Sequence, residues 1–363
     1  MDRSPYFFTM MPKTGETISL AMTSAGKLSS EKMKRQEKDE LFAAHMPGVL
    51  HYHRLMLADA VRNKLLVRAI NQVVTTETSF LDIGAGSGVW AILAAKLGAK
   101  RVVAVEVEEC LIPFIHKHAQ ENGVGDRIEI IHARSDEAKI KGKFDVIVSE
   151  LFGGDAVGAE TVNSFIDLRE RFLATGGILI PQALTMFAVP VHIKTPAIPA
   201  GLPLQSDLLQ SISRNYPQSL SHTDKKKIEY LAEPVPIVEL DFGSVTSPPS
   251  LAALTAKWAM KDISRANAIA TFNRHSFTEK ITMDSRDSQS WGTGTYPFEP
   301  FAVGTGELQA SLTIDPKKGN WTVSVPTSPE LRPQSYSPAF AFMRVRMAQA
   351  ATPHRKFNSP KTK

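Results

Sequence analysis

The feature that most constrains this chain is a glycine-rich turn, spanning 84–88, between two strand candidates. Phe80–Ile83 is a short apolar run typical of a buried strand, and Val89–Leu97 is an apolar helix candidate. Arg101–Glu106 follows as a second strand candidate and ends in an acid. A strand, a glycine turn, a helix and a strand in this order predict a βαβ unit that binds a nucleotide-like ligand at the turn.

The spacing of the glycines narrows the choice of ligand. Gly84, Gly86 and Gly88 form the pattern Asp-x-Gly-x-Gly-x-Gly, in which Asp82 precedes the first glycine by two residues. A dinucleotide-binding loop needs its third glycine one residue later, where this chain has a valine. The loop contains no lysine and therefore offers no side-chain cation to a phosphate. Glu106 lies 18 residues after Gly88, where its carboxylate can accept bonds from both hydroxyls of a ribose.

This loop resembles the S-adenosylmethionine loop of class I methyltransferases, whose cofactor carries no phosphate. The resemblance implies S-adenosylmethionine as the cofactor. It also implies that the three glycines, Asp82 and Glu106 belong to the cofactor site. A glycine-rich turn that binds no ligand is the alternative interpretation of the same residues.

Length and composition are typical of a soluble globular protein. The 363 residues are enough for two domains, and 43% are hydrophobic while 22% are charged. No apolar run approaches the roughly 18 residues of a membrane span, and the N-terminal residues do not form a secretory or transit peptide. We therefore expect a cytoplasmic protein, with the nucleus as an alternative, and no membrane partner. The single cysteine, Cys110, excludes an internal disulfide and a cysteine-based zinc cluster, so no metal site is predicted.

Alternation of strand and helix candidates over residues 45–191 predicts a Rossmann-like, doubly wound sheet. The strand candidates after the first βαβ unit are Ile128–His132, Phe144–Glu150, Gly177–Ile180 and Leu184–Val191, and the further helix candidates are His51–Ile70 and Glu160–Leu173. Residues 192–236 are rich in proline, serine and leucine and hold one short helix candidate, Ser206–Asn215. Residues 237–327 contain short alternating runs separated by turn residues, which predict an antiparallel barrel or sandwich.

The two ends of the chain lack regular patterns. Residues 1–44 combine a loose leader with a solvated helix face, and residues 328–363 form a basic tail that we expect to be disordered. The last twenty residues contain no acid and six basic residues, namely Arg344, Arg346, Arg355, Lys356, Lys361 and Lys363. A solvated tail is the favoured interpretation, and weak binding of nucleic acid is the alternative.

The strand Phe144–Glu150 ends in an acid at the sheet edge where open α/β folds bind ligands. With the following loop it resembles the protein arginine N-methyltransferases, in which a Ser-Glu pair opens a hairpin carrying two glutamates that hold the substrate guanidinium. Arg62 resembles the arginine of that family that pairs with the methionine carboxylate of the cofactor. Asp136 resembles the acid that contacts the adenine amino group, and Ser290–Trp291 resembles part of a Thr-His-Trp loop.

The family resemblance implies a fold and an activity. The fold is a cofactor-binding Rossmann-like domain at 45–191, a dimerisation arm at 192–236 and a β-barrel at 237–327. The activity is methyl transfer from S-adenosylmethionine to arginine in a protein substrate. An apolar stripe within the arm, Leu208, Leu209 and Ile212, would contact a second subunit in a homo- or hetero-oligomer, and packing inside its own barrel is the alternative.

The chain departs from the family pattern in the substrate half. The second glutamate is expected nine residues after Glu150, at Ala159, but the nearest acid, Glu160, lies ten residues away. An extra residue in a hairpin turns a side chain to the opposite face unless a β-bulge absorbs it. Ser290 stands where the family has histidine. His275 is the one imidazole nearby in the barrel sequence, and we interpret it as a structural residue.

The paired tyrosines expected before the first helix fall on Ala43 and Pro47. Glu150 and Glu160 remain the catalytic candidates. The alternative is a catalytically deficient subunit that oligomerises with an active arginine methyltransferase and activates it.

Overall fold

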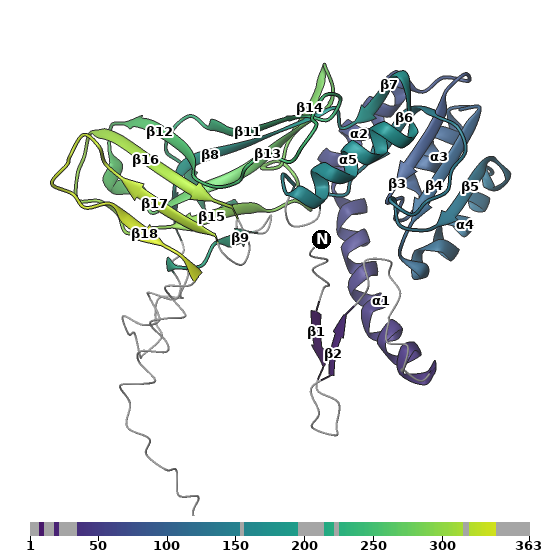
Figure 1. Cartoon of the computed structure of the whole chain (residues 1–363), viewed down its shortest axis with the longest axis horizontal. Coiled ribbons are helices and arrows are strands. Elements are labelled where there is room, and N and C mark those ends of the chain that lie inside the picture. Colours follow the sequence, from purple (N-terminus) through teal and green to yellow (C-terminus); the bar gives the residue numbers. More distant parts are fainter. Residues whose placement is uncertain are drawn as a thin grey trace, which may run out of the picture. The chain divides into compact units, whose positions relative to one another are not determined.

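The computed structural model describes residues 7–10, 18–21, 35–152, 156–194, 214–220, 225–314 and 319–338, with side chains from Met46 onward. The chain divides into two compact units (Figure 1). Unit 1 comprises Met1–Thr185, Glu239–Pro249 and Asn273–Trp291, and unit 2 comprises Met186–Val238, Ser250–Phe272 and Gly292–Lys363.

Unit 1 contains a five-stranded sheet in the order β5-β4-β3-β6-β7, and each neighbouring pair is parallel. The strands are β3 (Ser79–Ile83), β4 (Arg101–Glu106), β5 (Ile128–His132), β6 (Phe144–Ser149) and β7 (Leu173–Ile180). The chain passes from β3 to β4 on one side and later returns to place β6 on the other side of β3. The carboxyl end of β3 is therefore a topological switch point, where open α/β sheets bind their ligands.

Five helices accompany this sheet, with two short 3-10 segments beside α4. They are α1 (Arg35–Ala58), α2 (Ala60–Val73), α3 (Val89–Lys96), α4 (Ile112–Glu121) and α5 (Ala159–Phe172), with η1 (Glu109–Leu111) and η2 (Gly125–Arg127). The core of unit 1 is apolar and joins α2 and α3 to the strands through residues that include Leu66, Ala94 and Phe80. Phe277 and Met283, more than 190 residues away in sequence, are buried in the same core.

Most of the predicted elements of unit 1 are confirmed, and β4 and β5 have the predicted bounds. The prediction of one continuous helix over His51–Ile70 is wrong. The helix is interrupted at Asp59, whose backbone is non-helical (φ −75°, ψ 88°) and whose side chain caps α2 by accepting from the backbone N–H of Arg62. A capping carboxylate satisfies an N–H that has no partner inside the helix, so the interruption is stabilised locally.

The strands that follow β7 form two antiparallel sheets. One has seven strands, namely β8 (Ala183–Ile193), β9 (Gln218–Leu220), β10 (Ile228–Tyr230), β11 (Val235–Asp241), β13 (Ala268–Thr278), β14 (Ile281–Asp284) and β15 (Thr293–Pro297). The other is β12 (Leu254–Met260), β16 (Gly306–Thr313), β17 (Asn320–Ser324) and β18 (Gln334–Tyr336), with η3 (Ile263–Arg265) following β12. The second unit has its own core around Trp258 and Trp321. A Rossmann-like domain followed by an antiparallel β-barrel domain is therefore the fold, as predicted.

Several predicted segment boundaries differ from the observed elements. β1 (Phe7–Met10) pairs with β2 (Ile18–Ala21) inside the predicted loose leader, and β18 pairs with β17 inside the predicted tail. Residues 273–291 belong to unit 1, although their position along the chain suggests the barrel, because their apolar side chains pack on α2 and the sheet. The apolar stripe of the arm and the basic residues of 344–363 lie outside the described residues.

Within the described residues, no helix has both the length and the apolar character needed to cross a membrane. The same residues contain no cluster of three or more His, Cys, Asp or Glu side chains suited to a metal ion.

Candidate active site

The glycine loop joins β3 to α3 at the switch point of the sheet. Gly84 and Gly86 have φ of +70° and +57°, the left-handed region that favours glycine. A Cβ on Gly84 would lie 2.7 Å from Cδ2 of Leu151, and one on Gly86 would lie 2.5 Å from Cε1 of His53. The backbone conformation therefore favours glycine at both positions, and any other residue would also have to displace the side-chain ends of Leu151 and His53. Gly88, with φ +78°, caps α3 under the same restriction.

Glu106 ends β4 and connects that strand to the glycine loop. Its Oε2 accepts from the N–H of Gly86 at 2.6 Å, and its Oε1 accepts from the N–H groups of Val107 and Glu108, each at 2.8 Å. Burial raises the pKa of this carboxyl, and the three N–H donors oppose that rise. Glu106 offers a carboxylate to hydroxyl groups, and the glycine loop has no cation for a phosphate. These residues therefore fit a nucleoside without phosphates.

Asp82 lies near the carboxyl end of β3 and is bonded to α3. It is 1% exposed, and its Oδ2 accepts from the backbone N–H of Ala91 in the first turn of α3 at 3.0 Å. Burial raises the pKa of Asp82 to about 8, which the Ala91 bond opposes and the charges of Glu150 and Glu106 increase. Its observed contact is therefore with the chain itself, and its predicted role at the cofactor stays a prediction.

The raised pKa of Asp82 predicts a pH dependence of stability. The unfolded carboxyl loses its proton near pH 4, whereas the folded one keeps it until about pH 8. The folded state therefore binds more protons over this range, so its contribution to stability is complete below pH 4 and is lost as pH rises to 8. Asp82→Asn should remove this loss. Chemical unfolding at pH 5 and pH 8 should show the wild type losing more than about 1 kcal/mol relative to the variant, and parallel pH profiles would contradict the assignment.

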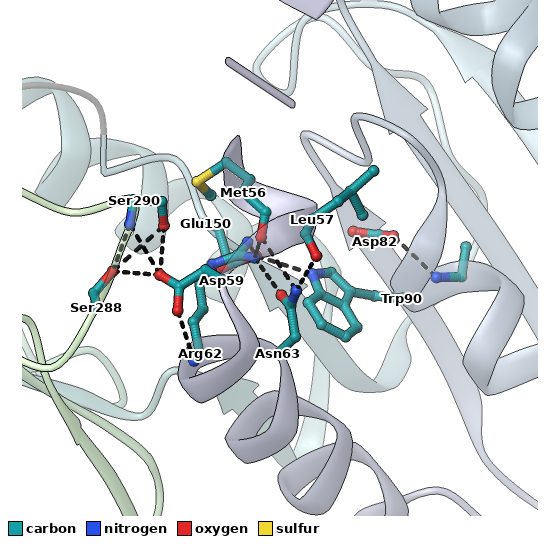
Figure 2. A network of polar contacts seen from close by, with 11 residues as sticks. Met56, Leu57, Asp59, Arg62, Asn63, Asp82, Trp90, Glu150, Ser288 and Ser290 are labelled. Carbon is teal, nitrogen blue, oxygen red and sulfur yellow. Dashed lines mark hydrogen bonds and ion pairs between the residues drawn. The ribbon is translucent and has the colours of Figure 1, made fainter. Parts of the chain in front are cut away.

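Arg62, Glu150 and Trp90 form a buried polar network (Figure 2). Glu150 follows the carboxyl end of β6, and Arg62 lies in the first turn of α2. Arg62 Nε donates to Oε1 of Glu150 at 2.8 Å, and Arg62 Nη2 donates to Oε2, so the guanidinium and carboxylate form a two-bond fork. Trp90 Nε1 donates to the same Oε2 at 2.9 Å. The two charged side chains are 5% and 9% exposed.

The guanidinium of Arg62 has further partners. Its Nη1 donates to the carbonyl oxygen of Met56 at 3.2 Å and to Oδ1 of Asn63 at 2.6 Å. Its Cζ lies 5.7 Å from the ring centre of Trp90 and 6.0 Å from that of Trp291, distances at which aromatic faces attract cations. A residue predicted at the cofactor and one predicted at the substrate are thus directly bonded to each other.

Asp59, the cap of α2, bonds the loop that contains Ser288, Ser290 and Trp291. Its Oδ2 accepts from the Oγ atoms of Ser288 and Ser290, at 2.5 and 2.8 Å, and from the backbone N–H groups of Gln289 and Ser290. Burial opposes ionisation of Asp59, but the bonds from Ser288, Ser290 and Arg62 outweigh it and lower the pKa. Ser290, which stands where the family pattern has histidine, is therefore one of two serines that bond Asp59. The helix-capping spacing from Asp59 to Arg62 was the available sequence signal, and the loop partner, 229 residues away, had none.

The structure does not bring Glu160 into this network. Glu160 lies exposed in the first turn of α5, and its charge raises the pKa of Arg134, after the larger effects of Asp136. Its side chain makes no hydrogen bond or ion pair with Glu150 or Arg62 among the residues described. Asp136 follows β5 and forms a two-bond ion pair with Arg134. The bonds from Arg134 lower the pKa of Asp136. The roles of both acids stay predictions.

His275 is packed among aromatic rings. Its ring centre lies 4.7 Å from that of Phe152 and 4.2 Å from that of Trp291. Burial, followed by the charge of Arg62, lowers its pKa to about 3, so the imidazole is neutral at pH 7. A neutral, buried ring agrees with the structural interpretation of this histidine.

The chain is similar to known methyltransferases in sequence. Residues 63–182 match the family model described as ribosomal protein L11 methyltransferase (PrmA). The chain is 30% identical to protein arginine N-methyltransferase 6 of Xenopus laevis over 168 residues, 46% of this chain and 48% of that protein. It is 30% identical to ribosomal protein arginine N-methyltransferase rmt3 of Schizosaccharomyces pombe over 166 residues, 45% of this chain and 30% of that protein.

Two solved structures share the fold. A Trypanosoma brucei PRMT1 enzyme-prozyme heterotetrameric complex with AdoHcy gives a TM-score of 0.65 at 16% identity, covering 78% of this chain and 96% of that one. Arabidopsis thaliana protein arginine methyltransferase 10, described in an open conformation, gives a TM-score of 0.63 at 17% identity, covering 79% and 98%.

In its fold and in its glycine loop, the chain is similar to class I S-adenosylmethionine-dependent methyltransferases. Within that class, sequence and fold confirm the resemblance to the protein arginine N-methyltransferase family, and with it the predicted cofactor. The sequence matches to the two named relatives span less than half of the length of each relative.

Proposed function

We propose that this protein transfers a methyl group from S-adenosylmethionine to the guanidinium of an arginine in a protein substrate. The observation that carries the proposal is the two-bond fork between Glu150 and Arg62. It places a carboxylate with the geometry to hold a guanidinium at the carboxyl edge of the sheet, beside the glycine loop. The names of the relatives support arginine as the acceptor.

The chain's residues divide the work of this reaction. Bound S-adenosylmethionine supplies an electrophilic methyl group on a positively charged sulfur. The glycine loop, Glu106, Asp136 and Arg62 would hold the cofactor, and Glu150 would hold the substrate. A guanidinium is planar and has no free lone pair, so an acid that binds one edge must also draw positive charge away from the nitrogen to be methylated. Accurate positioning then matters, because an error of about 1 Å can cost 10²-fold in rate.

A second function is a catalytically deficient subunit that assembles with an active arginine methyltransferase. Its support is the exposed position of Glu160, outside the Arg62–Glu150 network. A site with one acid holds a guanidinium less firmly than a site with two. The fold similarity to an enzyme-prozyme complex is compatible with this function.

One assay separates the two functions. The purified full chain is incubated with labelled S-adenosylmethionine and an arginine-rich peptide, first alone and then with an active paralogue. Label transfer by the chain alone, absent in Glu150→Gln, supports the enzyme and excludes the deficient subunit. No transfer alone, together with higher activity of a co-purified paralogue, supports the subunit. No transfer and no effect on the paralogue would overturn both.

A further inference from the structure

We propose that Trp90 is a positioning residue that holds the Glu150 carboxylate in place while a substrate guanidinium replaces Arg62. This inference rests on the proposed function. It concerns a residue whose sequence position, inside the apolar helix α3, suggests only packing.

Trp90 lies on a helix that is packed in the core of unit 1, so its indole has a fixed position. Trp90 is the second residue of α3, two residues after the cap at Gly88, and it is buried in the core of unit 1. An indole N–H is a donor only, so it needs an acceptor when buried. The acceptor here is Oε2 of Glu150, at 2.9 Å (Figure 2). The bond therefore runs from a fixed helix to the acid that would hold the substrate.

The number of acceptor positions on Glu150 sets an order of binding. A carboxylate has about four lone-pair positions, two on each oxygen. Arg62 uses one on each oxygen, and Trp90 uses another on Oε2. A substrate fork also needs one position on each oxygen, and Oε2 has none left. The substrate guanidinium can bind Glu150 as a fork only after Arg62 leaves.

Arg62 has a reason to leave, because its predicted partner is the carboxylate of the cofactor. When it turns to that group, one position opens on each oxygen of Glu150, and the Trp90 bond remains. Trp90 then keeps the carboxylate from rotating at the stage when no other donor holds it. We therefore expect cofactor to bind before substrate, and Trp90 to affect substrate binding more than cofactor binding.

Trp90→Phe tests the role of the N–H, because it keeps a buried aromatic ring. Trp258→Phe is the matched control. Its indole nitrogen, in the core of unit 2, is buried without a hydrogen-bond partner among the described residues, so the same substitution removes no such bond. A hydrogen bond to a charged group contributes about 1.5–3 kcal/mol, which corresponds to roughly 10–100-fold in affinity. Anisotropy titrations of the full chain with a labelled arginine peptide, with S-adenosylhomocysteine present, should show at least a tenfold loss for Trp90→Phe.

The same titrations give the expected contrasts. Affinity for S-adenosylhomocysteine should change by less than about threefold in both variants, and without that ligand the wild type should bind the peptide weakly. Equal peptide affinities for Trp90→Phe and Trp258→Phe would overturn the proposal.

A spectroscopic measurement keeps the test independent of methyl transfer. The indole N–H signals of ¹⁵N-tryptophan-labelled protein are assigned by single Trp→Phe variants. Glu150→Gln should shift the Trp90 signal more than those of Trp258 and Trp321. An unmoved Trp90 signal would overturn the positioning role. A shifted signal with no label transfer in any assay would instead leave the hydrogen bond standing and remove the proposed methylation.

Discussion

Glu150→Gln is expected to lower methyl transfer to an arginine peptide by on the order of 10³-fold. The amide keeps the size of the side chain but loses the charge, and its NH₂ group faces the N–H groups of the guanidinium instead of accepting from them. One of the two bonds of the fork is therefore lost, and the positive charge of the substrate is left uncompensated in a buried site. Single-turnover rates at saturating cofactor measure this step without product release.

The control for Glu150→Gln is Glu160→Gln, the same change at the second predicted acid. Because Glu160 is exposed on α5 and outside the Arg62–Glu150 network, its variant should stay within about threefold of the wild type. Equal losses in the two variants would show that Glu160 joins the site when substrate binds. Circular dichroism and cofactor affinity of both variants check that any loss does not come from unfolding.

Arg62→Met should lower the free energy of unfolding by about 3–5 kcal/mol. Methionine retains an apolar stem but removes the cation, so the Glu150 carboxylate keeps the Trp90 bond and loses both bonds of the fork. A buried charge without its counter-charge is costly because the protein interior solvates it poorly. Urea unfolding of the full chain at pH 7 measures the difference.

Two comparisons make this prediction specific. Arg265→Met breaks the exposed ion pair with Glu229 and should lower the free energy of unfolding far less than Arg62→Met, because solvent screens exposed charges. The double variant Arg62→Met, Glu150→Gln should recover part of the loss, because neither charge then remains buried alone. Additive losses in the double variant would show that the pair does not act as a unit.

Local patterns predicted the elements of the Rossmann-like domain because each pattern lies within one short stretch of chain. The bounds of β4 followed from an apolar run ending in Glu106, and the turn at Gly84–Gly88 followed from glycine spacing. The interruption of the first helix at Asp59 was missed. Apolar periodicity continues through that residue, and the break depends on a side-chain bond to the backbone of Arg62.

Short local patterns in the sequence were enough to predict a parallel sheet, a glycine loop without a phosphate-binding cation, and acids at the ends of β4 and β6. The contacts between these residues, in contrast, depend on how the folded chain brings distant segments together. Arg62 and Glu150 are 88 residues apart, and Asp59 and Ser288 are 229 apart. Periodicity reports which face of an element is buried, but the partner of a buried charge is chosen by the packing of whole elements. For this reason the ion pair, the serine contacts of Asp59 and the hydrogen bond of Trp90 became visible only in the folded chain.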